Sequence, residues 1–204
     1  MKLYFAPGAC SLAPHILLRE TGLAFELVRV DLASHTYDGQ KDFYAINNKG
    51  SVPVLELDDG ERLTEGPVIA QWICDRAGRT DLMPAAGTLA RYRVMEWQNF
   101  VTSELHKSYS PLFKPDLGAE IKDWFRQALR KRYEYVDRRL QTSDYLASST
   151  YTAADTYLFV VTNWAGHVGV DLSGLAALDA FMNRVRAREA VQAALAAEGL
   201  VKKA

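Results

Sequence analysis

The chain has 204 residues, of which 49% are hydrophobic, so it can bury one sizeable core or two small ones. Its 24 basic and 25 acidic side chains give a formal charge of −1, which argues against nucleic acid or an anionic membrane as a partner. Apolar runs stay well short of the roughly 20 residues that cross a bilayer, and no export signal is visible, so we expect a small-molecule partner.

The first third of the chain alternates between strand-like and helical patterns. Four short runs have strand-like patterns, at residues 2–5, 26–30, 54–57 and 61–64. The last two flank an Asp59-Gly60 step, which predicts a hairpin because glycine accepts positive φ without strain. Helical patterns cover residues 11–20, closed by Gly22, and the stretch from Pro67 to about Gly78. The predicted order is β-α-β followed by β-β-α.

A change of pattern near residue 80 predicts a domain boundary. Residues 79–87 carry Pro84 between two glycines and have no sustained period, so we expect a linker there, with domains at 1–80 and 88–204. Beyond it, helical patterns cover residues 89–109, 121–140, 153–168 and the alanine-rich 187–197. Thr152-Ala153-Ala154-Asp155 has the spacing of a capping box and predicts a helix start. The predicted fold class is an α/β domain followed by an all-α domain.

Cys10 is the residue best placed for chemistry, because it lies in the loop Pro7-Gly8-Ala9-Cys10-Ser11 between the first strand and the first helix. Unpaired N–H groups and the positive end of the helix dipole favour an anion, so we expect a lowered thiol pKa. A buried thiol that packs as a small hydrophobe is the equally open alternative. Ala13 stands where a dithiol motif would have its second cysteine, so Cys10 would act alone or with an external thiol.

The cysteines and histidines do not form a metal-binding pattern. Cys10 and Cys74 are too few for a disulfide framework and lack the paired spacing of a zinc site, and Cys74 fits a plain core position. The four histidines likewise have no metal-ligand spacing. We therefore expect no bound metal and a location in the reducing cytoplasm.

Two segments before the linker are candidates for binding a small zwitterion. Glu65-Gly66-Pro67 turns into a helix, so its N–H groups suit a ligand carboxylate and Glu65 suits an ammonium. An acidic residue at a helix start is also common for dipole reasons alone. Val52-Pro53 precedes a strand, where a cis proline would expose the Val52 backbone to a peptide ligand, although only about one X-Pro bond in twenty is cis.

On the first helix beyond the linker, Asn99, Ser103 and His106 stand at i, i+4 and i+7. In an α-helix these positions share one face. The polar stripe would line a cleft, or it would be a solvated face with a satisfied histidine.

Taken together, these segments resemble the bacterial beta-class glutathione transferases over nearly the whole chain. The motifs that carry the resemblance are Met1 to Phe5, Pro7 to Ser11, Gly50 to Leu55, Leu63 to Glu65, Asn99 with Ser103 to His106, and Thr152 to Asp155. The resemblance implies a thioredoxin-like domain followed by an all-helical one, assembled as a cytoplasmic homodimer. It further implies an enzyme of detoxification that conjugates glutathione, its co-substrate, to small hydrophobic electrophiles.

The resemblance also implies roles for particular residues. Cys10 and His106 would be catalytic, and the residues implied to bind glutathione are Cys10, His35, Val52, Pro53, Glu65, Gly66, Asn99, Ser103, Glu104, His106 and Lys107. Val52 would pair with the cysteinyl backbone before a cis Pro53, Glu65 and Gly66 would hold the γ-glutamyl end, and His35 would approach the glycine carboxylate. Asn99, Ser103 and Glu104 would reach glutathione across the dimer interface, whereas His106 and Lys107 would approach its sulfur.

Two positions depart from the family pattern. Gly66 replaces a common serine and loses a hydroxyl contact. His35 replaces a common lysine, and imidazole is a weaker, pH-sensitive partner for a carboxylate. We therefore expect looser glutathione binding.

Two other functions remain open at this point. Cys10 would support glutathione-dependent disulfide exchange, resembling a monothiol glutaredoxin. Alternatively, the protein would carry hydrophobic ligands without turnover. An apolar second substrate would lie against Tyr109, Phe113 and Trp164, although a core role is the alternative for each.

Overall fold

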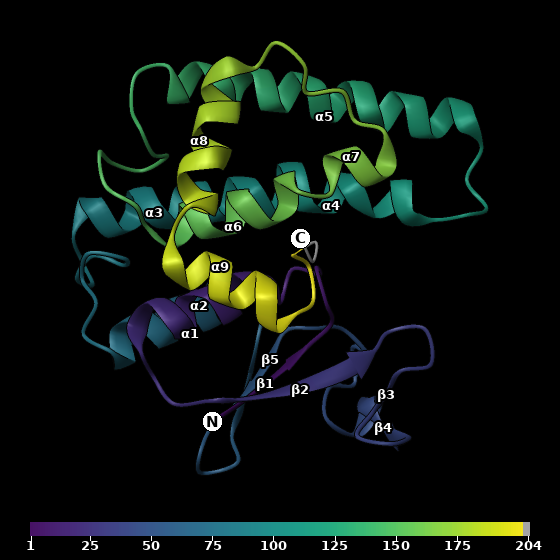
Figure 1. Ribbon diagram of the computed structural model, residues 1–204, viewed down its shortest axis with the longest axis vertical. Coiled ribbons are helices and arrows are strands. Elements are labelled where there is room, and N and C mark those ends of the chain that lie inside the picture. The colour runs from purple at the N-terminus through teal and green to yellow at the C-terminus, as the bar shows by residue number, and fades with distance from the viewer. Residues whose placement is uncertain (202–204) are drawn as a thin grey trace. The chain divides into compact units, whose positions relative to one another are not determined.

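The computed structural model describes residues 1–201 and divides into two compact units (Figure 1). The first contains Met1–Thr80 together with the C-terminal segment that begins at Arg188, and the second contains Asp81–Ala187. The boundaries expected from the sequence, 1–80 and 88–204, do not anticipate this return of the chain to the first unit. As limits of independently folding domains, they remain a prediction.

The first unit is built on a sheet with strand order β4-β3-β2-β1-β5-β6. Its strands are β1 (Lys2–Phe5), β2 (Glu26–Asp31), β3 (Thr36–Tyr37), β4 (Lys41–Asp42), β5 (Val54–Glu56) and β6 (Arg62–Thr64). Strand β1 is parallel to β2 and antiparallel to β5. The helices are α1 (Leu12–Thr21), α2 (Gly66–Arg76) and α9 (Glu189–Ala197), and a 3-10 turn covers Phe43–Ala45. The predicted thioredoxin-like β-α-β and β-β-α order is therefore present.

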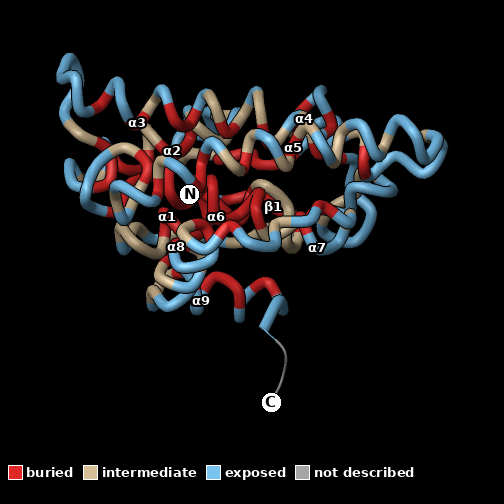
Figure 2. Tube along the Cα trace, turned by 90° about the horizontal axis from the view of Figure 1, so that it is seen from above, coloured by how far each residue is buried: buried red, intermediate tan, exposed pale blue. Residues whose placement is uncertain are grey.

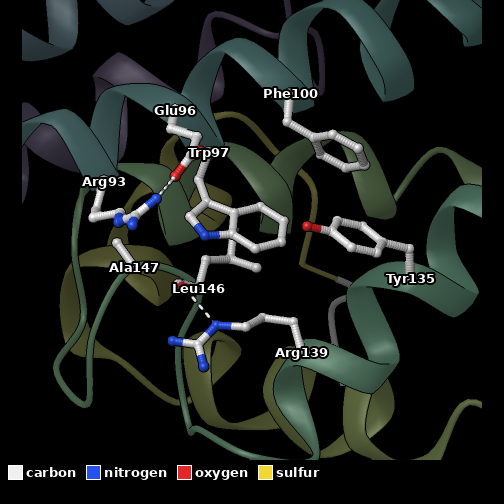
Figure 3. A pocket seen from close by; sticks show the side chains of 8 residues that line it. All are labelled: Arg93, Glu96, Trp97, Phe100, Tyr135, Arg139, Leu146 and Ala147. Atoms are coloured by element: carbon white, nitrogen blue, oxygen red, sulfur yellow. Dashed lines mark hydrogen bonds and ion pairs between the residues drawn. The ribbon is translucent and has the colours of Figure 1, made fainter.

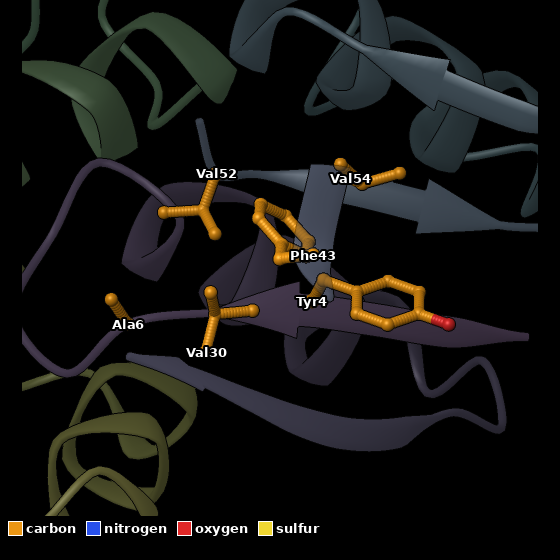
Figure 4. Close-up of a cluster of buried hydrophobic side chains, with 6 residues drawn as sticks. All are labelled: Tyr4, Ala6, Val30, Phe43, Val52 and Val54. Carbon is orange, nitrogen blue, oxygen red and sulfur yellow. The ribbon is translucent and has the colours of Figure 1, made fainter. Parts of the chain in front are cut away.

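Both faces of this sheet are covered by apolar side chains. The helices α1, α2 and α9 lie together on one side, with α1 packed against each of the other two (Figure 1). Leu3 and Leu55 pair across β1 and β5 and are fully buried. Side chains alternate along a strand, so the neighbouring pair Tyr4 and Val54 points to the other face. There they join a buried cluster that includes Phe43 of the 3-10 turn (Figure 4).

The second unit is helical in its regular structure. Its elements are α3 (Leu89–Phe100), a π-helix (Val101–His106), α4 (Lys107–Tyr109), a 3-10 turn (Ser110–Phe113), α5 (Ala119–Leu140), α6 (Ala153–Thr162), α7 (Ala165–Val168) and α8 (Ala176–Arg186). The predicted helix 89–109 is thus interrupted by a π-helix, and the predicted helix 153–168 is divided into α6 and α7. No helix within residues 1–201 combines the length and apolar character needed to cross a membrane.

Helix α6 is the central element of this unit, and every one of its residues is buried (Figure 2). The predicted capping box fixes its start: the Asp155 carboxylate accepts hydrogen bonds from the backbone N–H groups of Thr152 and Leu146, each at 2.8 Å. Burial raises the pKa of Asp155 to about 6 despite these donors. The box therefore serves folding.

Candidate active site

Cys10 lies at the junction that the sequence predicts. It follows β1 and precedes Leu12, the first residue of α1, and it is partly buried. The Ser11 hydroxyl closes the loop by accepting from the Ala6 N–H at 3.2 Å and donating to the Ala6 carbonyl at 3.3 Å. Both contacts are buried, so the loop backbone holds the sulfur at the start of the helix.

The Cys10 thiol meets the segment that begins β5. Its Sγ donates a hydrogen bond to the Val52 carbonyl oxygen at 3.2 Å. The Val52–Pro53 peptide bond is cis, as the resemblance implies, and both residues are buried. A peptide ligand that pairs with the Val52 backbone would therefore place its own side chain beside Cys10.

Strand register brings Glu65 to the same sheet edge. Tyr4 pairs with Val54 and Val54 with Thr64, so the end of β1, the start of β5 and the end of β6 coincide. Glu65 comes next, with φ of +69°, a conformation that costs of order 1–3 kcal/mol in a non-glycine residue and is typical of functional turns. Gly66 then opens α2, and the first N–H groups of a helix have no acceptor within it.

Lys49 is a neighbour of Glu65 that the sequence interpretation missed. Its Nζ contacts Glu65 Oε1 at 2.5 Å and Thr64 Oγ1 at 2.9 Å. Both members of the ion pair are substantially exposed, at 45% and 65% of their side-chain surface. A ligand ammonium that binds Glu65 would share the carboxylate with this lysine. In the sequence, Lys49 stands directly before Gly50-Ser51-Val52-Pro53, and this position could have indicated that it lies near the site.

His35 also lies near this edge. A Cβ built on Gly50 would come within 3.0 Å of His35 Nδ1, so glycine allows the close approach of the two segments. The imidazole stacks on Tyr44, with ring centroids 4.7 Å apart. Its Nδ1 is buried and has no hydrogen-bond partner within residues 1–201. An acceptor or donor from a ligand would satisfy it.

The remaining candidates lie in the second unit and separate into two groups. Asn99, Ser103 and Lys107 are exposed, and Ser103 Oγ donates to the Asn99 carbonyl at 3.1 Å. Glu104 Oε2 accepts from Arg132 Nε at 2.8 Å. His106 instead meets Tyr157 of α6, with His106 Nδ1 and the Tyr157 hydroxyl 2.5 Å apart.

The prediction that Asn99, Ser103 and His106 share one helical face is wrong. The prediction assumed an α-helix, but Val101–His106 is a π-helix. A wider turn rotates each residue less around the axis, so His106 falls behind the stripe and turns toward α6. Asn99 and Ser103 alone keep a common exposed face.

Aromatic side chains gather around His106. Trp164 lies edge-on to it at 4.9 Å, and Phe113 contacts Trp164 at 5.9 Å with 54% of its own surface exposed. Tyr109 belongs to the core, because it is fully buried and donates to the Tyr133 hydroxyl at 2.9 Å. Phe113 and Trp164 thus form the accessible apolar surface beside His106.

Other chemistries find little support in the described part of the chain. Within residues 1–201, no group of three or more histidine, cysteine or acidic residues could hold a metal. Burial and the nearby Glu56 charge raise the pKa of Tyr4 to about 12, so this tyrosine stays protonated at neutral pH. Cys10 is therefore the nucleophile candidate in the first unit.

Comparisons with known proteins agree with one another. Residues 8–76 match the family model described as glutathione S-transferase, N-terminal domain, and residues 100–189 match that of the C-terminal domain. Glutathione S-transferase GstA of Escherichia coli O157:H7 is 45% identical, covering 98% of this chain and 100% of its own.

Two solved structures superpose along almost the full length. A sphingomonad glutathione S-transferase in complex with glutathione has a TM-score of 0.94 at 44% identity, covering 98% of this chain and 100% of its own. The beta-class enzyme of Sphingomonas chungbukensis has a TM-score of 0.95 at 46% identity with the same coverage.

Proposed function

The chain belongs to the glutathione S-transferase family, and we propose that its reaction takes place at the sheet edge where Cys10 meets the Val52 carbonyl. It is an enzyme of the bacterial beta class and uses glutathione as its co-substrate. A non-catalytic ligand carrier is thereby not favoured. The 3.2 Å contact between Cys10 Sγ and the Val52 carbonyl oxygen is the observation that carries the proposal.

In this proposal glutathione lies extended along the edge of the first unit. Its cysteinyl backbone pairs with Val52 before the cis Pro53, so that its sulfur lies beside Cys10. The γ-glutamyl carboxylate accepts hydrogen bonds from the N–H groups at Gly66. The γ-glutamyl ammonium pairs with Glu65, whose charge Lys49 partly neutralises. His35 Nδ1, buried and without a partner within residues 1–201, binds the glycine carboxylate.

The chemistry requires the glutathione thiolate, since the thiolate and not the thiol is the nucleophile. The sulfur attacks an electrophilic carbon, a carbon–sulfur bond forms, and the leaving group departs with its bonding electrons. The thiol proton passes to solvent. The start of α1 favours negative charge on sulfur, and the bound geometry brings the reactants together.

The second unit contributes the electrophile site. The exposed Phe113 ring and Trp164 offer an apolar surface, and His106, held by Tyr157, approaches the sulfur together with Lys107. In a homodimer, the exposed Asn99 and Ser103, with Glu104, serve glutathione bound to the partner subunit. We also propose a cytoplasmic location, because the small number of cysteines fits a reducing compartment.

Disulfide exchange is a second candidate activity, favoured by the position of Cys10 at the helix start. The Cys10 thiolate would attack a glutathione mixed disulfide, form its own disulfide with glutathione and release the other thiol. A second glutathione thiolate would then displace Cys10 and leave as glutathione disulfide. Ala13 at the resolving position makes this external thiol necessary.

Two assays on the Cys10→Ala variant separate these activities. One measures transfer of glutathione to an aromatic halide, and the other measures reduction of a mixed disulfide. We expect Cys10→Ala to abolish reduction, because no other thiol lies at the edge, while Cys74→Ala, a buried cysteine of α2, serves as the matched control. Reduction that survives in Cys10→Ala would exclude the exchange mechanism. Failure of the unaltered protein to bind millimolar glutathione would overturn the proposed site.

A further inference from the structure

Aromatic side chains line a groove between α3 and α5 of the second unit, where the Trp97 and Tyr135 rings stack at 5.7 Å (Figure 3). Asn99, Ser103 and Glu104 belong to the same stretch of helix and are proposed to serve the partner subunit. A second copy of the chain would therefore cover this groove in the homodimer, and its openness in one chain does not indicate a small-molecule site.

The Lys49–Glu65 ion pair of the first unit lies at the proposed site for the γ-glutamyl end of glutathione. Lys49 is exposed, but buried Asn47 fixes the backbone that carries it. The Asn47 side chain accepts from the Lys49 N–H at 3.2 Å and donates to the Ser51 carbonyl at 2.7 Å. An ammonium has three N–H donors, and the contacts of Lys49 with Glu65 and Thr64 use two of them. The third can reach a bound anion.

The first turn of α2 has little else to offer a ligand carboxylate. Pro67 has no N–H. The N–H groups of Val68 and Ile69 already donate to the Glu65 carbonyl at 3.0 Å each. Gly66 contributes an N–H but no hydroxyl, and a Cβ built on it would meet no other segment of residues 1–201 within 4 Å. A carboxylate bound in this open space meets one N–H of the turn, so a cation close by would strengthen its binding.

The charges of Lys49 and Glu65 complement those of a free α-amino acid group. At neutral pH the γ-glutamyl end carries an ammonium and a carboxylate on the same carbon. Glu65 alone would attract this ammonium and repel the carboxylate beside it, and the positive charge of Lys49 offsets the repulsion. Exposed ion pairs contribute little net stability, so the pair can open for a ligand at small cost.

We propose that Lys49 is a glutathione-binding residue, which pairs with the γ-glutamyl carboxylate while Glu65 pairs with the ammonium. The inference rests on the proposed position of glutathione at Gly66. Charges of alternating sign then lie next to one another, and Lys49 supplies the contact that Gly66, without a hydroxyl, cannot make. The site therefore selects thiols whose γ-glutamyl unit keeps both its carboxylate and its amino group, and it discriminates against decarboxylated or N-acylated forms.

Calorimetric titration of the full-length protein with two ligands tests the proposal. One is glutathione, and the other is 4-aminobutanoyl-cysteinylglycine, which lacks only the γ-glutamyl carboxylate. We expect Lys49→Met to weaken glutathione binding about tenfold and to change the affinity for the analogue by less than about twofold. In steady-state kinetics KM for glutathione should rise with kcat unchanged, because the contact is the same before and during the reaction.

Control variants separate the charge from effects on folding. Lys2→Met removes a lysine of similar exposure, 47% against 45%, from its ion pair with Glu56 at the opposite end of β1, and it should leave both affinities unchanged. Lys49→Arg keeps the positive charge and should retain most of the glutathione affinity. Gly66→Ser in the Lys49→Met background should recover part of it, because the hydroxyl enters the open space beside the helix start.

An unchanged glutathione affinity in Lys49→Met would remove this lysine from the site. An equal loss for glutathione and the analogue would show that Lys49 only holds Glu65 in place and does not bind the carboxylate. Failure of the unaltered protein to bind glutathione would refute the proposed site as well, so titration of the unaltered protein tells the two failures apart.

Discussion

Replacing Glu198 by alanine should be among the most destabilising single changes in the first unit. Glu198 follows α9, and its side chain is fully buried. One carboxylate oxygen accepts from the Gly8 N–H at 2.9 Å, and the other lies 2.8 Å from His15 Nδ1. Arg19 Nε donates to His15 Nε2 at 2.9 Å, so the neutral tautomer with its proton on Nδ1 satisfies every contact.

The magnitude follows from the two hydrogen bonds that Glu198→Ala removes. An unsatisfied buried donor costs about 1–3 kcal/mol, which applies in full to His15, and the loss of the partly buried Gly8 contact adds a smaller amount. Total unfolding free energies are about 5–15 kcal/mol, so the change removes a large part of the stability. Gly8 stands two residues before Cys10, and its release should also lower kcat at temperatures where the variant is still folded.

Urea unfolding followed by circular dichroism measures the free energy of unfolding, and glutathione transfer measures kcat. Glu189→Ala is the matched control, because Glu189 begins α9, the helix that Glu198 follows, but is exposed, and its loss should cost less than about 1 kcal/mol. Glu198→Gln should fall between the two, since an amide accepts one of the hydrogen bonds only. If Glu198→Ala unfolds within 1 kcal/mol of the unaltered protein, water replaces the carboxylate and the reasoning fails.

Three further changes have expected outcomes. The folded pKa of Asp155 lies near 6, above its usual value, so its contribution to stability falls as pH rises from about 4 to 6; Asp155→Asn should remove this slope in urea unfolding across that range. Gln98 is buried and neither polar atom of its side chain has a partner within residues 1–201, so Gln98→Met should maintain or raise the melting temperature, and a large fall would reveal an internal water. His35→Lys should lower KM for glutathione with kcat unchanged in steady-state kinetics, whereas an unchanged KM would remove position 35 from the glycine subsite.

Local patterns located the first half of the candidate site. Cys10 sits where a strand-like run gives way to a helical one, and this turn depends on neighbours in sequence alone. The Asp59-Gly60 hairpin likewise fixed how β5 and β6 pair, which brings Val52 and Glu65 to one edge. The same Asp-Gly step occurs at Asp38-Gly39 in the β3–β4 hairpin. That hairpin was not predicted, because its strands have only two residues each and show no alternating pattern.

Contacts between residues far apart in the sequence could not be predicted from such local patterns. Glu198 and His15 are 183 positions apart, and from the sequence each looks like an ordinary polar residue, His15 within α1 and Glu198 at the end of α9. Their mutual satisfaction in a buried site returns α9 to the first unit, so the domain boundary near residue 80 does not describe the end of the chain. The sequence interpretation also missed helix α8, although a local pattern was present there. Leu178, Phe181 and Val185 recur at helical spacing and are all buried.

The His106 position shows why a correct helix prediction did not yield correct side-chain directions. Periodicity identified residues 89–109 as helical, but the wheel that placed Asn99, Ser103 and His106 on one face assumed a uniform turn. The π-helix at Val101–His106 changes the phase in the middle of the stretch. Side chains toward the end of such a segment are displaced around the axis relative to an α-helix, so His106 reaches the Tyr157 hydroxyl and Trp164 while Ser103 stays exposed. A local change in hydrogen-bond register therefore decides which polar residue of this helix faces the aromatic surface beside it.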